Sequence, residues 1–347
     1  MGSLALFLGL LIFSFISTSI VIVPFIDLLY QMKFQRANQT TRDVFGKLTP
    51  IFDKFHAKKA GVPVGGGLLV ILVVSILFAL FLPMMNYFGI DVTSVYAAPR
   101  TEVNIIFFTF LSFGLLGLYD DIKKFFGFDK EKFFGLKAPF KLFLQVALAT
   151  IVAIMLYHQL GIDILYIPFI GTFSLGIWYI PFAVFVIVSF ANAVNITDGL
   201  DGLASGVLMI SLFGLWFLSA SILDVPLSLF LSLWIGSLVS FLYFNVYPAR
   251  MFMGDVGALA FGATLGVVGL LLGKVVALGI IGFVFVFEVA TSLMQILARK
   301  FWKRKLFPAA PFHLTLQTHG WEEPKIVQRV WLMQIMLTLF GVWLAVI

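Results

Sequence analysis

Long apolar runs are the feature that most limits how this chain can fold. Segment 67–82 carries no charge and lacks the polar alternation of barrel strands. Backbone N–H and C=O groups find no water inside a bilayer, so such runs must form helices or a closed barrel. Hydrophobic residues make up 61% of the chain and charged residues 12%, well below the charged share of soluble domains. The sequence therefore predicts an all-α polytopic integral membrane protein with a single transmembrane domain, 1–347.

The hydropathy of the chain predicts about ten spans. A hydrocarbon core of about 30 Å needs about 20 apolar residues per helix. The first run has no small-residue cleavage site after it, so we interpret it as a retained span rather than a signal peptide. The predicted spans are 4–30, 65–87, 103–119, 141–158, 176–195, 203–222, 226–245, 256–272, 275–296 and 328–347.

Basic residues gather on connections that fall on one face of a ten-span protein. Every Lys and Arg except Arg100 and Lys274 lies in segments 31–64, 120–141 and 297–329 or at Arg250. Basic connections stay in the cytoplasm, so this face is predicted to be cytoplasmic and both termini are predicted to lie outside.

Unusual acids collect on the same face. Asp120 and Asp121 end the third predicted span, and Asp255 opens the eighth. Carboxylates there are costly to desolvate, and adjacent like charges favour a neutralising cation. Hard oxygen ligands suit Mg²⁺ or Mn²⁺, and the chain has no cysteine to supply a thiolate. With Lys124 and Lys141 nearby in the sequence, the pattern predicts a metal–phosphate site, although any single acid could instead be a solvated boundary residue.

Glu288 is the one acid placed deep within a predicted span. An intramembrane acid is a functional candidate by default. It could equally hydrogen-bond a neighbouring helix as a structural lock, and the sequence leaves both interpretations open.

Three acidic segments resemble a known enzyme superfamily. Asp120–Lys124 (Asp-Asp-Ile-Lys-Lys), Asn192–Ala204 and Met253–Leu259 are similar to the acidic motifs of the polyprenyl-phosphate N-acetylhexosamine-1-phosphate transferases. Segment His313–Trp331, with Gly-Trp-Glu-Glu-Pro-Lys-Ile-Val at 320–327, resembles the phospho-N-acetylmuramoyl-pentapeptide transferase branch. The resemblance runs over nearly the whole chain.

The resemblance implies a reaction and its participants. The enzymes of this branch transfer phospho-MurNAc-pentapeptide from UDP-MurNAc-pentapeptide to undecaprenyl phosphate, forming lipid I and UMP for peptidoglycan synthesis. The implied cofactor is Mg²⁺ and the implied location is the cell membrane, with the active site on the cytoplasmic face. A homodimer fits the resemblance, and nucleic acid is not expected as a partner.

The resemblance also implies roles for individual residues. Asp255 would ligate Mg²⁺, and Asp120 or Asp121 would accept a proton from the lipid phosphate or orient it. His313 would bind substrate or assist the leaving pyrophosphate. The residues expected to bind substrate are Lys59 and Lys141, which would neutralise phosphates, and Asn192, Asn195, Asp198 and Asp201, which would shape the pocket.

Two departures from the branch pattern keep other functions open. The branch usually has three consecutive histidines where this chain has His313-Leu314-Thr315, and two threonines where this chain has Val62 and Val64. These changes keep alive a sister transferase that places GlcNAc-1-phosphate on the same lipid. A transporter is a rival from another class, but it would spread its acids through the membrane depth. A silent paralogue would not be expected to retain every acidic motif.

Overall fold

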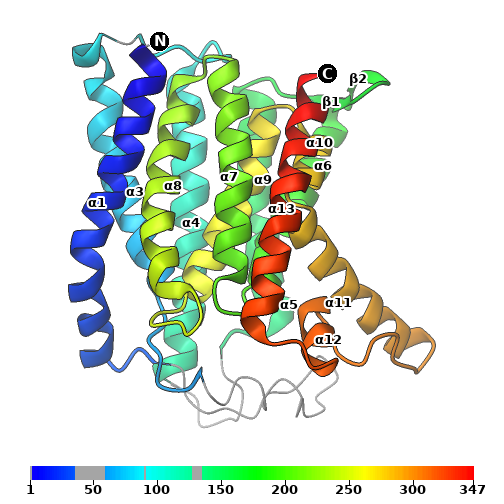
Figure 1. Cartoon of the computed structure of the whole chain (residues 1–347). Helices are drawn as coiled ribbons and strands as arrows, with labels where there is room; N and C mark the ends of the chain where they lie inside the picture. Colours follow the sequence, from blue (N-terminus) through cyan, green and yellow to red (C-terminus); the bar gives the residue numbers. More distant parts are fainter. Residues whose placement is uncertain (1, 36–58, 90, 127–134) are drawn as a thin grey trace.

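The computed structural model describes residues 2–35, 59–89, 91–126 and 135–347. Most of the basic segment 31–64 lies outside these ranges. Within the described residues the chain forms a bundle of long helices, and both termini lie at the same end of it (Figure 1).

The helices follow the predicted spans closely. Nine described helices are long and apolar enough to cross a membrane, and a bent pair supplies a tenth. The nine are α1 (Gly2–Gln31), α3 (Gly66–Met84), α4 (Pro99–Phe126), α5 (Ala138–Ile154), α6 (Tyr179–Thr197), α7 (Leu203–Ser221), α8 (Val225–Asn245), α9 (Gly254–Leu271) and α13 (Glu323–Val346). The polytopic all-α prediction is confirmed. Which face meets the cytoplasm stays a prediction.

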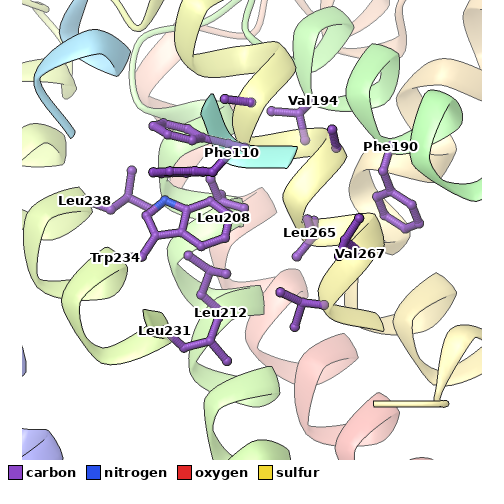
Figure 2. Close-up of a cluster of buried hydrophobic side chains, with 14 of the residues drawn as sticks. Phe110, Phe190, Val194, Leu208, Leu212, Leu231, Trp234, Leu238, Leu265 and Val267 are labelled. Atoms are coloured by element: carbon purple, nitrogen blue, oxygen red, sulfur yellow. The ribbon is translucent and has the colours of Figure 1, made fainter. Parts of the chain in front are cut away.

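Two helices form the centre of the bundle. Within their spans, α8 is 94% buried and α9 is 89% buried, whereas α1 is 28% buried and presents apolar side chains outward. Figure 2 shows the packing at this centre, where Trp234 of α8 lies against Phe110 of α4 with ring centroids 5.4 Å apart. Side-chain packing of this kind holds membrane helices together, since lipid tails are as apolar as the core.

Small residues let α9 approach its neighbours closely. A Cβ on Gly262 would lie 2.3 Å from the carbonyl oxygen of Phe190 in α6. A Cβ on Gly117 of α4 would lie 2.2 Å from the carbonyl oxygen of Asp255. Close helix packing through glycine thus fixes the start of α9 against α4, α3 and α6.

The ninth predicted span, 275–296, is not one helix. It divides into α10 (Val275–Ile281) and α11 (Phe283–Phe301), which are bent by 82° at Gly282. The Ile281 carbonyl at the break accepts hydrogen bonds from Ser211 Oγ at 2.9 Å and from Gln334 Nε2. Polar side chains from α7 and α13 therefore satisfy backbone that the bend exposes, as a buried kink requires.

Gln334→Leu is expected to destabilise this break. The buried Ile281 carbonyl would lose one of its two donors and keep Ser211, and the net loss of one such hydrogen bond costs about 0.5–1.5 kcal/mol. Thermal unfolding in detergent should show a lower midpoint than for Gln328→Leu, a matched change at an exposed position of the same helix. Equal midpoints for the two variants would contradict the role of Gln334.

The remaining elements cap the two ends of the bundle. At the end that holds the termini, β1 (Ile164–Ile167) and β2 (Gly171–Ser174) form an antiparallel hairpin with Ile164 opposite Ser174. At the opposite end lies the short helix α12 (Phe312–Thr318) (Figure 1). Single turns occur at η2 (Met85–Phe88), η3 (Met155–Gln159) and η4 (Gly176–Trp178).

Candidate active site

Two aspartates lie within the last turns of α4 rather than after its end. The third span was predicted to stop at 119, but the helix continues to Phe126. Asp120 and Asp121 are each only 2% exposed. The helix continues through these two charged residues because cations and backbone donors from neighbouring segments compensate their carboxylates. Hydropathy alone does not predict such contacts.

Asp120 and Asp255 share two ammonium groups. Lys141 Nζ lies 2.9 Å from Asp120 Oδ2 and also contacts Asp255 Oδ2. Lys124 Nζ lies 3.1 Å from Asp120 Oδ2 and 2.7 Å from Asp255 Oδ2. Buried carboxylates need such pairing to remain charged, and the shared lysines place cations between acids from α4 and α9.

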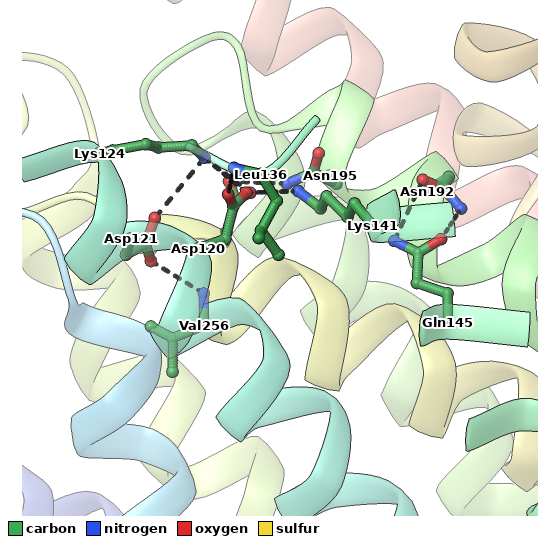
Figure 3. Close-up of polar contacts among 10 residues, drawn as sticks. Asp120, Asp121, Lys124, Leu136, Lys141, Gln145, Asn192, Asn195 and Val256 are labelled. Carbon is green, nitrogen blue, oxygen red and sulfur yellow. Dashed lines mark hydrogen bonds and ion pairs between the residues drawn. The ribbon is translucent and has the colours of Figure 1, made fainter. Parts of the chain in front are cut away.

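Asp120 and Asp121 accept hydrogen bonds from the backbone of different segments (Figure 3). Asp120 Oδ1 accepts the Leu136 N–H at 2.6 Å and so fixes the start of the segment that leads into α5. Asp121 Oδ2 accepts the Val256 N–H at 3.0 Å in the first turn of α9. A carboxylate at a helix N-terminus satisfies donors that have no partner within the helix. Asp121 therefore fixes the helix that carries Asp255.

Asn195 joins the acidic cluster, but Asn192 does not. Asn195 Nδ2 donates to Asp255 Oδ1 at 3.1 Å. Asn192, one turn earlier on α6, donates instead to Gln145 Oε1 of α5 at 2.7 Å (Figure 3). Gln145 is fully buried and lies one turn after Lys141. Asn192 thus ties α6 to the helix that presents Lys141.

A second charged group lies where α6 turns into α7. Lys59 Nζ lies 2.6 Å from Asp201 Oδ1 and 2.6 Å from Glu323 Oε1. Asp201 Oδ2 also accepts the Ala249 N–H at 2.9 Å. The Lys59 charge is therefore already matched by two carboxylates in the structure. This ion triad ties the loop 198–202 to the start of α13.

Lys59→Met should destabilise the protein strongly. The change leaves Asp201 and Glu323 buried without a cation, and breaking a buried pair in this way costs about 3–5 kcal/mol. The thermal midpoint in detergent should fall, and much of the loss should be recovered in Lys59→Met/Glu323→Gln. If the double variant is no more stable than the single one, the triad does not hold the loop.

His313 lies on the other side of the same loop. The ring is buried, with Nδ1 3.1 Å from Glu288 Oε2 of α11. A Cβ on Gly199 would lie 2.4 Å from His313 Nε2, so the imidazole fits only because this loop position is glycine. Asp198, which precedes Gly199 at the C-terminal end of α6, is half-buried.

The predicted site residues thus form three groups rather than one. One group is the acidic cluster, defined as Asp120, Asp121, Lys124, Lys141, Asn195 and Asp255. The others are the ion triad and the His313–Glu288 pair, and the loop 198–202 contacts both through Asp201 and Gly199. Sequence reasoning missed Gln145 and Glu323 as partners. It named Glu288 without its partner, because 25 positions separate Glu288 from His313.

The acidic cluster has suitable donors for Mg²⁺. Three carboxylates and the Asn195 amide oxygen are hard oxygen donors. Among the residues that the structure describes, no three acidic or histidine side chains form a ready-made metal cage. Mg²⁺ usually takes one or two carboxylates and completes its shell with substrate phosphates and water. Asp255, whose Oδ1 accepts a hydrogen bond from the neutral Asn195 amide, fits a single-carboxylate site.

Comparisons with known proteins show which family the chain belongs to. Residues 103–273 match the model of glycosyl transferase family 4. The chain is similar to phospho-N-acetylmuramoyl-pentapeptide-transferase of Desulfotalea psychrophila, with 39% identity over 83% of this chain and 80% of that one. It is 35% identical to the enzyme of that name from Aquifex aeolicus, over 94% of this chain and 91% of the relative. The Clostridium perfringens enzyme of that name is also 35% identical, over 91% of this chain and 90% of the relative.

Proposed function

Because this chain belongs to the phospho-N-acetylmuramoyl-pentapeptide transferase family, we propose that it transfers phospho-MurNAc-pentapeptide from UDP-MurNAc-pentapeptide to undecaprenyl phosphate. The products are lipid I and UMP. The observation that carries the proposal is the sharing of Lys124 and Lys141 by Asp120 and Asp255. Both substrates bring phosphates, and a membrane-embedded cluster of cations and metal-binding carboxylates suits them.

The reaction exchanges one phosphoanhydride bond for another. An oxygen of the lipid phosphate attacks the β-phosphorus of the donor, and the bond from that phosphorus to the bridging oxygen of UMP breaks. UMP leaves with the electron pair. Such transfers depend mainly on positioning and electrostatic stabilisation.

The residues of the acidic cluster divide these tasks. Lys124 and Lys141 would neutralise the donor phosphates. Asp120 and Asp121 would orient the lipid phosphate at the membrane boundary, while Asp121 also fixes the first turn of α9. Asp255 would hold Mg²⁺, with Asn195 orienting its carboxylate. Bound Mg²⁺ would offset negative charge that develops on the pyrophosphate oxygens.

The protein would act at the cytoplasmic face of the cell membrane. The acidic cluster lies at the C-terminal end of α4, and Lys123 and Lys137 lie close in the sequence to its two lysines. Basic connections favour the cytoplasmic side, where soluble UDP-linked donors are found. We also propose a homodimer, which the mass of the protein in lipid nanodiscs would test.

The altered histidine run is a change within the packed interior, and the choice between the two donors is left to the substrate assay. Leu314 and Thr315 occupy the positions where the family usually has histidines, and both side chains are buried. Thr315 Oγ1 donates to the Ala309 carbonyl, so it fixes the loop before α12. These two positions pack inside the protein, so their change alters the packing of the loop before α12.

The test is an assay of UMP release by purified protein with undecaprenyl phosphate and Mg²⁺. UDP-MurNAc-pentapeptide and UDP-GlcNAc are supplied in parallel reactions. Release with the pentapeptide donor alone, lost on chelation, is the expected result. Release with UDP-GlcNAc alone would reassign the chain to the sister transferases, and release that survives chelation would remove Mg²⁺ from the proposal.

A further inference from the structure

Glu288 makes its contacts with a single residue of the candidate site. The carboxylate is 3% exposed, and its two oxygens accept the His313 backbone N–H at 3.2 and 3.4 Å. One of the same oxygens contacts His313 Nδ1 at 3.1 Å. A structural lock between helices would need only the backbone contact. The additional contact with the ring fixes the direction of the imidazole as well.

The carboxylate also selects one tautomer of His313. An ionised Glu only accepts hydrogen bonds, so the proton in this contact belongs to Nδ1. Nε2 is then directed at the loop 198–202, where Gly199 leaves room for it. The hydrogen bond at one ring nitrogen decides what the other nitrogen can offer. In the neutral ring, Nε2 is left as the acceptor, and in the protonated ring it is a donor.

Helix α11 is held in place on both sides of Glu288. Before it, Ser211 and Gln334 bind the Ile281 carbonyl at the 82° break. Two turns after it, Gln295 Oε1 accepts the Leu306 and Phe307 N–H groups at 2.9 and 3.1 Å. The same face of α11 thus holds both the returning loop and the imidazole that follows it.

We propose that Glu288 is a positioning residue of the transfer reaction, fixing His313 with Nδ1 as donor and Nε2 against the loop that carries Asp198 and Asp201. The effect of Glu288 on turnover rests on the proposed function. The effect of Glu288 on the imidazole of His313 is independent of any substrate. Glu288 acts through His313, whose Nε2 lies against Gly199 of the loop that carries Asp198 and Asp201.

The experiment compares Glu288→Ala, Glu288→Gln and Glu102→Gln. Glu102 is a fully buried acid near the N-terminal end of α4, so Glu102→Gln controls for the loss of a buried carboxyl group. Ring ¹⁵N spectra of histidine-labelled protein report the tautomer, and the His313 signals are those missing in His313→Gln. The kcat, the KM for the donor and the thermal midpoint complete the readouts.

Glu288→Ala is expected to lose both the single Nδ1-protonated tautomer of His313 and most of its turnover. Wild type and Glu102→Gln should show a protonated Nδ1 at His313, and Glu288→Ala should show a mixture of tautomers. A misdirected ring should lower kcat about 10- to 100-fold, with a smaller change in KM. Glu288→Gln retains an acceptor oxygen and should lie between wild type and Glu288→Ala in both readouts.

Other outcomes overturn the inference. A lower thermal midpoint with an unchanged His313 spectrum and an unchanged kcat would make Glu288 a structural lock. A changed spectrum with unchanged kcat would show that the tautomer is irrelevant to turnover. If Glu288→Ala does not fold, Glu288→Gln decides between the same outcomes. Wild type that is inactive with both donors would contradict the proposed function, while the spectra still test the positioning of His313.

Discussion

Asp255→Asn should abolish turnover and leave the protein folded. The change removes the negative charge proposed to hold Mg²⁺ but keeps the size of the side chain. It also leaves Asp120 as the main partner of Lys124 and Lys141. Losing one electrostatic contact to the transition state costs about 10²–10³-fold in kcat, and losing the metal should cost at least as much. UMP release with the pentapeptide donor measures the effect.

The control for this prediction is Asp27→Asn, at an exposed position of α1. It removes the same charge from a place remote in sequence from every acidic motif, so its turnover should match that of wild type. The residual rate of Asp255→Asn should not recover as the Mg²⁺ concentration is raised. Substantial activity in Asp255→Asn at ordinary Mg²⁺ would assign the metal to other ligands.

The spans could be predicted from the sequence because bilayer thickness sets helix length. Where the prediction failed, the cause lay outside the local sequence pattern. Gly282 lies in an apolar run, and hydropathy averages over such a run without detecting the 82° bend there. The bend depends on Ser211 and Gln334, which donate from other helices. A tertiary contact therefore decides what the local pattern leaves open.

The acids of the site could also be predicted, but their partners could not. Motif resemblance identified Asp120, Asp121 and Asp255, and the structure places all three in one cluster. The motif resemblance did not indicate that the charge of Lys59 is matched by Asp201 and Glu323, since 264 positions separate Lys59 from Glu323. A charged residue in an apolar sequence indicates that a counter-charge is needed. Which residue supplies that counter-charge depends on which helix ends meet in the fold.

Lys141→Met should give the second large loss of turnover. The ammonium group joins Asp120 to Asp255, and in the proposed reaction it would neutralise a donor phosphate. Removing such a charge should lower kcat/KM by about 10²-fold. Lys137→Met is the matched control, because Lys137 is exposed and precedes Lys141 by one turn of the same helix. Its turnover should stay close to that of wild type.

Ligand binding can separate phosphate recognition by Lys141 from a purely structural role. Calorimetry with UDP and with uridine compares two ligands that differ only in their phosphates. A hydrogen bond to a charged group contributes about 1.5–3 kcal/mol, so Lys141→Met should weaken UDP binding about 10- to 100-fold and leave uridine binding unchanged. An equal loss for both ligands would mean that the pocket has collapsed. Unchanged affinity for UDP would restrict Lys141 to holding Asp120 and Asp255 together, because a cation that contacts the phosphates cannot be removed without cost to the ligand that carries them.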